Sequence, residues 1–126
     1  MSRIILVVDD ELSMTHMLNL ILRKKGFEVL VTTDPLQVEG ILDSTTPDLI
    51  ILDYMMPGLD GIRLCRRIRD RLDTRQTPIF MLSALSDVQV IRDSRAAGAD
   101  EYFTKDELAT RMMHEINRRI PPAAAV

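Results

Sequence analysis

Three acidic side chains in the first half of the chain could bind a metal ion together. Asp9 and Asp10 follow the apolar run Ile4–Val8. Asp53 follows a second apolar run at 49–52. Two like charges about 4 Å apart repel by roughly 4 kcal/mol at an effective dielectric constant near 20, so three clustered carboxylates need a cation or a bound proton. Because oxygen ligands around an acidic cleft suit Mg²⁺, the pattern predicts a magnesium site that shares its shell with a phosphate.

Two further side chains could bind that phosphate. Ser83 follows the apolar run 79–82 and provides a hydroxyl donor, and Lys105 follows the run 102–103 and provides a positive charge. Each of them alone is an ordinary strand-end or surface residue. Together they would let the Asp53 carboxylate attack phosphorus and form an aspartyl phosphate, while the metal and the lysine offset charge on the phosphoryl oxygens.

Five short apolar runs must position these side chains, and they alternate with segments of helical periodicity. The runs are Ile4–Val8, 29–31, 49–52, 79–82 and 102–103. The first, third and fourth are almost continuously aliphatic, as in strands buried on both faces of a parallel sheet, whereas the second could lie at an edge. The alternation predicts an α/β fold with a doubly wound parallel sheet, in which ligands bind beyond the carboxyl ends of the strands.

The helix-period segments carry recognisable starts and apolar faces. Aspartates before Pro35, Gly61 and Val88 are typical N-caps, and Gly26 is a typical helix stop. The predicted caps are Asp34, Asp60 and Asp87; the predicted apolar faces are Met14, Leu18, Ile21 and Leu22 in the first helix, Gly61, Cys65, Ile68 and Leu72 in the third, and Leu108, Met112, Ile116 and Ile120 in the last.

Composition sets limits on the class of protein. The 126 residues suit one domain, and a net charge of −3 with no concentrated basic face argues against direct nucleic-acid binding by these residues. The single cysteine, Cys65, cannot form an internal disulfide. No window approaches the roughly 20 apolar residues that cross a bilayer, so we expect no membrane segment and a cytoplasmic location.

Four segments of the chain resemble the receiver domain of two-component response regulators, of the kind found in chemotaxis regulators. They are ILVVDDE (5–11), LIILDYMMPGLDG (49–61), MLSA (81–84) and GADEYFTK (98–105). The resemblance runs from about residue 3 to 120, which implies a receiver domain over 1–120 and a tail or the start of a linker over 121–126. It implies a flavodoxin-like five-stranded sheet with strand order 2-1-3-4-5 and five helices.

The resemblance also implies roles for individual residues in phosphorelay signalling. Asp53 would be the phosphoryl acceptor. Asp9, Asp10 and Asp53 would hold Mg²⁺ together with the backbone carbonyl of Met55. Ser83 and Lys105 would contact the phosphoryl group, and Tyr102 would turn inward as a switch when Ser83 moves. A histidine kinase or a histidine phosphotransfer protein would be the donor. The domain would promote its own magnesium-dependent phosphotransfer and dephosphorylation rather than act as an enzyme on other substrates.

A homodimer through the fourth helix, fifth strand and fifth helix is a further expectation. Three arginines of the predicted last helix could pair with acids across such a dimer, or could form a solvated charged face. The arginines are Arg111, Arg118 and Arg119, and the candidate acids are Asp100 and Glu101.

One position departs from the family pattern. A proline usually follows the lysine in receivers, joined by a cis peptide bond, and here the residue is Asp106. A cis bond before a residue other than proline costs about 3–4 kcal/mol, so a trans bond is compatible with this sequence. Asp106 could then cap the last helix.

Three other functions are open to a sequence of this kind. A dehalogenase-like phosphatase also forms an aspartyl phosphate, but it needs a second Asp where this chain has Met55. A flavodoxin-like FMN carrier would place a phosphate against the acids at 9–11, which would repel it. A degenerate receiver acting only as an interaction module would lack one of the acids, the hydroxyl or the lysine, and all are present.

Overall fold

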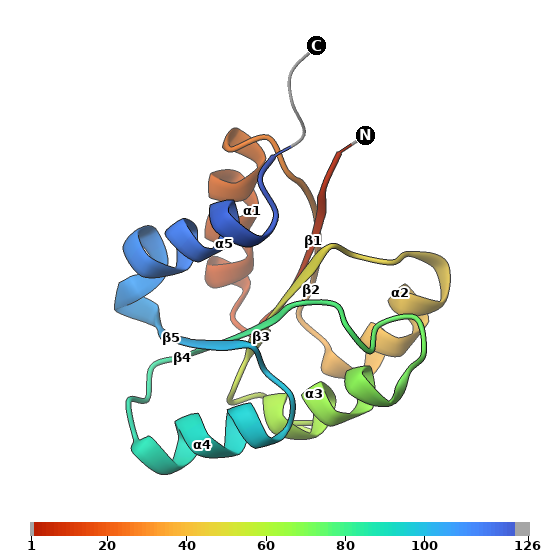
Figure 1. Cartoon of the computed structure of the whole chain (residues 1–126), viewed down its shortest axis with the longest axis vertical. Helices are drawn as coiled ribbons and strands as arrows, with labels where there is room; N and C mark the ends of the chain where they lie inside the picture. Colours follow the sequence, from red (N-terminus) through yellow and green to blue (C-terminus); the bar gives the residue numbers. More distant parts are fainter. Residues whose placement is uncertain (1, 123–126) are drawn as a thin grey trace.

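The computed structural model describes residues 2–122 of the chain. Five strands form one parallel sheet, in the order β2-β1-β3-β4-β5 (Figure 1). The strands are β1 Ile4–Val8, β2 Glu28–Thr32, β3 Leu49–Asp53, β4 Ile79–Ser83 and β5 Glu101–Thr104. This order confirms the expected flavodoxin-like sheet, with the second strand at an edge. Most of the expected tail, 123–126, lies outside the described residues.

Helices cover both faces of the sheet. Helices α1 and α5 lie on one face, and α2, α3 and α4 lie on the other (Figure 1). The helices are α1 Leu12–Lys24, α2 Val38–Ser44, α3 Gly61–Asp70, α4 Val88–Ala96 and α5 Met113–Arg119. Short 3-10 turns at Pro35–Gln37 and Lys105–Glu107 precede α2 and the last helical segment, and Leu108–Met112 is π-helical. Among the described residues no helix combines the length and apolar character that crossing a membrane requires.

Alternation along each strand divides the core into two layers. Ile5 and Val7 of β1 pack with α1 and α5, whereas Leu6 and Val8 pack with α2 and α3. Because both faces of the central strands are covered, nearly every residue of these strands is buried, which explains the continuous aliphatic runs. Each buried Leu, Ile or Val side chain contributes about 1.5–3 kcal/mol relative to an exposed one.

Most of the helix starts follow the expected caps. Asp34, Asp60 and Asp87 each accept a hydrogen bond from a backbone N–H of the first turn, at 3.0, 2.8 and 2.7 Å. The expected stop after α1 is also present, since Gly26 has a φ of 96°, a left-handed conformation that favours glycine.

Two local expectations were wrong. Leu72 does not lie on a buried face, because α3 ends at Asp70 and Leu72 is 83% exposed. Asp106 does not cap the last helix, because it lies inside the turn Lys105–Glu107, which Thr104 and Glu107 cap as a capping box. The described peptide bonds are all trans, so the chain enters its last helix without a cis bond after Lys105.

Candidate functional site

The three predicted acids meet at the carboxyl edge of the sheet. Asp53 is the last residue of β3, and Asp9 follows the neighbouring strand β1. One carboxylate oxygen from each of Asp9, Asp10 and Asp53 lies within 4.8 Å of the others. Asp9 and Asp53 are buried, whereas Asp10 is exposed at the rim. Adjacent parallel strands therefore bring together side chains that are more than forty residues apart.

The cluster carries more negative charge than its protein partners neutralise. Oδ1 of Asp9 accepts a hydrogen bond from the Glu11 N–H at 2.9 Å, but Oδ2 is buried and has no hydrogen-bond partner. Burial, followed by the nearby charge of Asp9, raises the pKa of Asp53 to about 7. Burial also raises the pKa of Asp9. An oxygen-only set of ligands with an orphaned buried oxygen fits a hard divalent cation such as Mg²⁺.

Ser83 and Tyr102 lie on the next two strands. Ser83 ends β4 and is buried, and its Oγ accepts a hydrogen bond from the Leu85 N–H at 3.1 Å. The Tyr102 ring of β5 is also buried, and its hydroxyl donates to the Leu85 carbonyl at 2.6 Å. Both side chains therefore hold the loop that follows β4. The ring already points inward here, so a movement of Tyr102 that is coupled to Ser83 stays a prediction.

Lys105 reaches the acidic cluster from the end of β5. Its Nζ lies 2.8 Å from Oε1 of Glu11 and 3.9 Å from Oδ2 of Asp9. Partial burial by itself would lower the pKa of Lys105, but the hydrogen bond to Glu11 and the charges of Asp9 and Asp53 raise it overall. The sequence pattern does not identify Glu11 as a partner of this lysine. The only signal was its position as the third acid in the run after β1.

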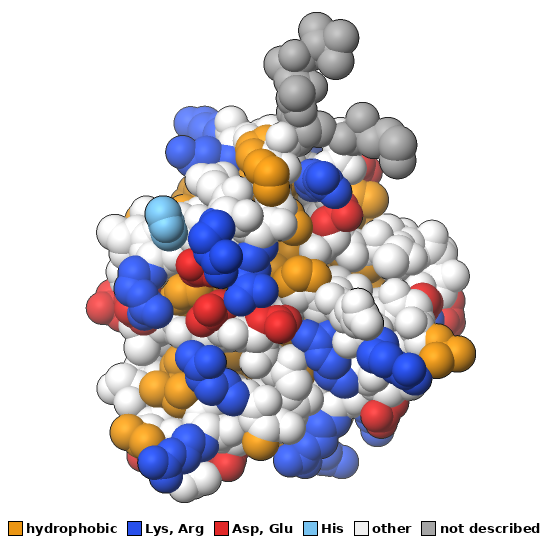
Figure 2. All heavy atoms as spheres, in the orientation of Figure 1, with side chains coloured by type: hydrophobic (Ala, Val, Ile, Leu, Met, Phe, Trp, Pro, Cys, Tyr) orange, Lys and Arg blue, Asp and Glu red, His pale blue; other side chains and the backbone are white. Residues whose placement is uncertain are grey.

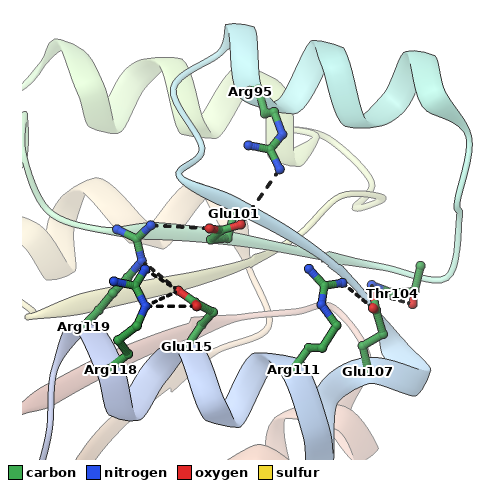
Figure 3. Close-up of polar contacts among 8 residues, drawn as sticks. All are labelled: Arg95, Glu101, Thr104, Glu107, Arg111, Glu115, Arg118 and Arg119. Atoms are coloured by element: carbon green, nitrogen blue, oxygen red, sulfur yellow. Dashed lines mark hydrogen bonds and ion pairs between the residues drawn. The ribbon is translucent and has the colours of Figure 1, made fainter.

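The backbone beside Lys105 is held by a polar network of its own. Glu107 accepts hydrogen bonds from the backbone N–H and the hydroxyl of Thr104, at 3.0 and 2.9 Å. Its second carboxylate oxygen pairs with Arg111 (Figure 3). The Arg111 guanidinium also lies over the Phe103 ring. The hydrogen bond from the Thr104 backbone, together with Arg111, holds the pKa of Glu107 below its usual range. This capping box holds the backbone just before Lys105, in a chain that has Asp106 where receivers usually have proline.

The loop after Asp53 completes the rim of the site. Met55 is 63% exposed and, with Asp10, lines a hollow beside the acidic cluster. The chain then returns closely to β3 at Gly61, whose N–H donates to the Tyr54 carbonyl at 2.9 Å. A Cβ on Gly61 would lie 2.5 Å from the Asp53 carbonyl oxygen, so only glycine fits there. The sequence predicts Gly61 at the start of a helix, as observed, but carries no signal of this close approach.

Comparison with known proteins identifies relatives over almost the whole chain. The model of the response regulator receiver domain matches residues 5–117. The phosphate regulon transcriptional regulatory protein PhoB of Rhizobium meliloti is 39% identical over 121 residues, which cover 93% of this chain and 53% of that protein. The DNA-binding response regulator MtrA of Mycobacterium tuberculosis is 37% identical over 118 residues, covering 90% and 50%. The chain thus spans about half the length of these curated relatives.

Solved structures agree with the sequence relatives. The BeF₃-activated N-terminal receiver domain of Klebsiella pneumoniae RstA is 27% identical with a TM-score of 0.86, covering 93% of this chain and 97% of that one. The receiver domain of the sensor histidine kinase PA1611 from Pseudomonas aeruginosa, with a magnesium ion in its active site cleft, is 26% identical with a TM-score of 0.86, covering 95% and 98%. These findings support phosphorylation-based signalling, and they do not support a phosphorylation-independent interaction module. The chain belongs to the response regulator receiver domain family, the phosphoacceptor signalling domains of two-component systems.

Proposed function

We propose that Asp53 is the residue of this chain that accepts the phosphoryl group. The observation that carries the proposal is the meeting of Asp53 with Asp9 and Asp10 at the carboxyl edge of the sheet, with the Lys105 ammonium 3.9 Å from Oδ2 of Asp9. A carboxylate oxygen of Asp53 bonds to phosphorus while the bond from phosphorus to the donor's imidazole nitrogen breaks. The donor is a histidine kinase or a histidine phosphotransfer protein.

Magnesium is part of this proposal. Asp9, Asp10 and Asp53 would hold the ion, with the backbone carbonyl of Met55 as a further ligand. When bound, Mg²⁺ offsets negative charge on the phosphoryl oxygens and on the carboxylates. The orphaned Oδ2 of Asp9 supports this assignment, as does the magnesium ion in the cleft of the PA1611 receiver.

The remaining site residues bind the new phosphoryl group. The Ser83 hydroxyl donates to one phosphoryl oxygen, and the Lys105 ammonium pairs with another. Movement of Ser83 toward the phosphoryl group would then shift the loop after β4, together with the Tyr102 hydroxyl that holds it, and so change the surface formed by α4, β5 and α5. The same positioned groups let the domain promote both its own phosphorylation and the later hydrolysis of the aspartyl phosphate by water.

The surface formed by α4, β5 and α5 is our proposed site of homodimer formation. Figure 2 shows basic and acidic side chains interspersed over this face. Within one chain, Glu101 of β5 already pairs with Arg119 at 3.5 Å and with Arg95 at 3.9 Å, and Arg118 pairs with Glu115 (Figure 3). Exchange of such pairs between two copies would link phosphorylation to assembly. Light scattering with and without beryllofluoride measures the mass of the assembly, and a monomer in both states contradicts the proposal.

Domain organisation and output are also proposals. We propose that residues 1–120 form the receiver domain and that 121–126 begin a tail or linker. Because MtrA is described as a DNA-binding response regulator and is about twice as long as this chain, we propose that these residues do not themselves contact DNA.

A gel-shift experiment tests the acceptor. Incubation with acetyl phosphate and Mg²⁺ should produce a retarded band on a phosphate-affinity gel, and Asp53→Ala should abolish it. Asp70→Ala, which removes an exposed acid at the end of α3, is the matched control and should shift like the wild type. A shift that persists in Asp53→Ala would assign the phosphoryl group to another residue.

A further inference from the structure

We propose that Glu11 is a positioning residue that holds the Lys105 ammonium until Asp53 is phosphorylated. This inference rests on the proposed function of Asp53 and Lys105. Glu11 competes with the phosphoryl group for the Lys105 ammonium. Its removal should therefore favour the phosphorylated form of the domain.

The geometry places Lys105 on Glu11 in the unmodified protein. Oε1 of Glu11 accepts a hydrogen bond from Lys105 Nζ at 2.8 Å, whereas Asp9 Oδ2 is 3.9 Å from the same nitrogen. Within residues 2–122, the ion pairs of Lys105 are with these two acids, and none is with Asp53. The closest contact of the lysine is thus an acid outside the proposed set of metal ligands.

A bound cation would strengthen this preference. Asp9, Asp10 and Asp53 are the residues that would hold Mg²⁺, and the ion would then repel the ammonium of Lys105. Glu11 faces outward at the rim of the site, with 59% of its side chain exposed, so it can remain paired with Lys105 while the three aspartates bind metal. The lysine therefore has a partner at each stage, first Glu11 and then the phosphoryl oxygens.

Only the side chain of Lys105 has to move in this exchange. The backbone at Thr104 is held by the Glu107 capping box, and Glu107 is itself paired with Arg111. Glu11 is equally well placed, because its own N–H donates to Asp9 and it stands at the start of α1. A lysine has a flexible four-carbon stem and a compact charge, which suits a transfer between two anions on a fixed backbone.

Beryllofluoride binding in the presence of Mg²⁺ measures the competition. Glu11→Gln keeps the shape of the side chain and removes its charge, so we expect about two- to fivefold tighter binding at low ionic strength. The gain should shrink in about 1 M salt, where the screening length is about 3 Å. Glu28→Gln is the matched control, because Glu28 is an exposed acid at the start of β2, the edge strand on the far side of the sheet from β5. An equal gain in Glu28→Gln would show an effect of net charge alone and would overturn the proposal.

A double-mutant cycle tests whether Glu11 acts through Lys105. In a Lys105→Met background, Glu11→Gln should give a clearly smaller gain, since there is no ammonium to release. An undiminished gain would mean that Glu11 simply repels the anion, and the proposal would be wrong.

The ammonium resonance of Lys105, followed by NMR, provides a readout other than affinity. Without beryllofluoride, Glu11→Gln should shift this resonance; with beryllofluoride bound, wild type and Glu11→Gln should coincide, because the lysine has left Glu11 in both. A resonance that still depends on Glu11 in the bound state would refute the exchange. Failure of the proposed function would be a separate result, because the Asp53→Ala variant would then still show the same gel shift as the wild type.

Discussion

The two ends of the β-sheet each hold a cluster of charged side chains, and the clusters are built differently. At the amino edge, where the strands begin, Arg69 near the end of α3 reaches the residues at the starts of β4 and β5. At the carboxyl edge, Asp9, Asp53 and Lys105 lie beyond β1, β3 and β5. Both clusters join segments that are distant in the sequence.

The amino-edge cluster has a protein partner for each of its strong groups. The Arg69 guanidinium donates to the carbonyls of Gly98, Thr74 and Thr77, at 3.0, 3.1 and 2.6 Å, and to Oδ2 of Asp100 at 2.8 Å. Oδ2 of Asp100 also accepts from the Ile79 N–H at 2.8 Å. Charges satisfied in this way stabilise one arrangement of the chain.

The carboxyl-edge cluster leaves charges short of partners. Asp9 has an orphaned oxygen, and burial with the charge of Asp9 raises the pKa of Asp53 to about 7. Such perturbed groups in an accessible cleft are typical of functional sites, because the missing partners are supplied by ligands. The comparison indicates that the amino edge contributes stability, whereas the carboxyl edge costs stability and keeps its side chains available for a cation and a phosphoryl group.

The largest expected effect comes from removing the arginine of the amino edge. Arg69→Met should lower the free energy of unfolding by about 3 kcal/mol, because three carbonyls and one carboxylate lose their donor. Urea unfolding measures this loss, and Arg66→Met, at an exposed position of the same helix, is the control and should change stability by less than about 0.5 kcal/mol. The folded fraction of Arg69→Met should still be phosphorylated. A loss below about 1 kcal/mol would remove the contrast between the two edges.

An opposite and smaller effect is expected at the carboxyl edge. Since the pKa of Asp53 is raised from 3.8 to about 7, the folded state keeps its proton at pH values where the unfolded state has lost it. The stability associated with this group is therefore highest below about pH 4 and is lost as the pH rises towards 7. Asp53→Asn should raise the free energy of unfolding by about 2 kcal/mol near pH 7.5 without metal, and by little near pH 4.

Urea unfolding at both pH values checks this sign. Asp70→Asn, at an exposed position, should show no such pH-dependent gain. Destabilisation by Asp53→Asn near pH 7.5 would mean that the Asp53 charge is already compensated within the protein.

The smallest expected effect is that of magnesium on stability. Mg²⁺ at ten times its dissociation constant should raise the free energy of unfolding by about 1.4 kcal/mol near pH 7.5, and a chelator should reverse the gain. The gain should be smaller near pH 5, where protons compete for Asp53, and also in Asp53→Asn. Thermal melts with Mg²⁺ and with EDTA measure it. An equal gain in Asp53→Asn would place the cation outside the acidic cluster.

Local sequence patterns predicted much of the fold. Aliphatic runs indicated the buried strands, because a strand covered on both faces leaves an almost continuous apolar run in the sequence. Asp34, Asp60 and Asp87 indicated helix starts, because a cap bonds to the first turn that follows it in the chain. The prediction for Leu72 was wrong because the apolar spacing continued past the point where the backbone leaves α3. The prediction for Asp106 was wrong because Thr104 and Glu107 provide the alternative capping box.

For the site, the sequence by itself determined the chemical groups: three acids, a hydroxyl and a lysine, each after a run that reads as a strand. Only the tertiary structure decided which of them touch and which lack a partner. Lys105 and Glu11 are 94 residues apart, and Arg69 and Asp100 are 31 apart, so no local pattern could pair them. Contacts of this kind depend on strand order and on the path of the chain between strands, and burial by the assembled layers then sets the charge balance at Asp9 and Asp53.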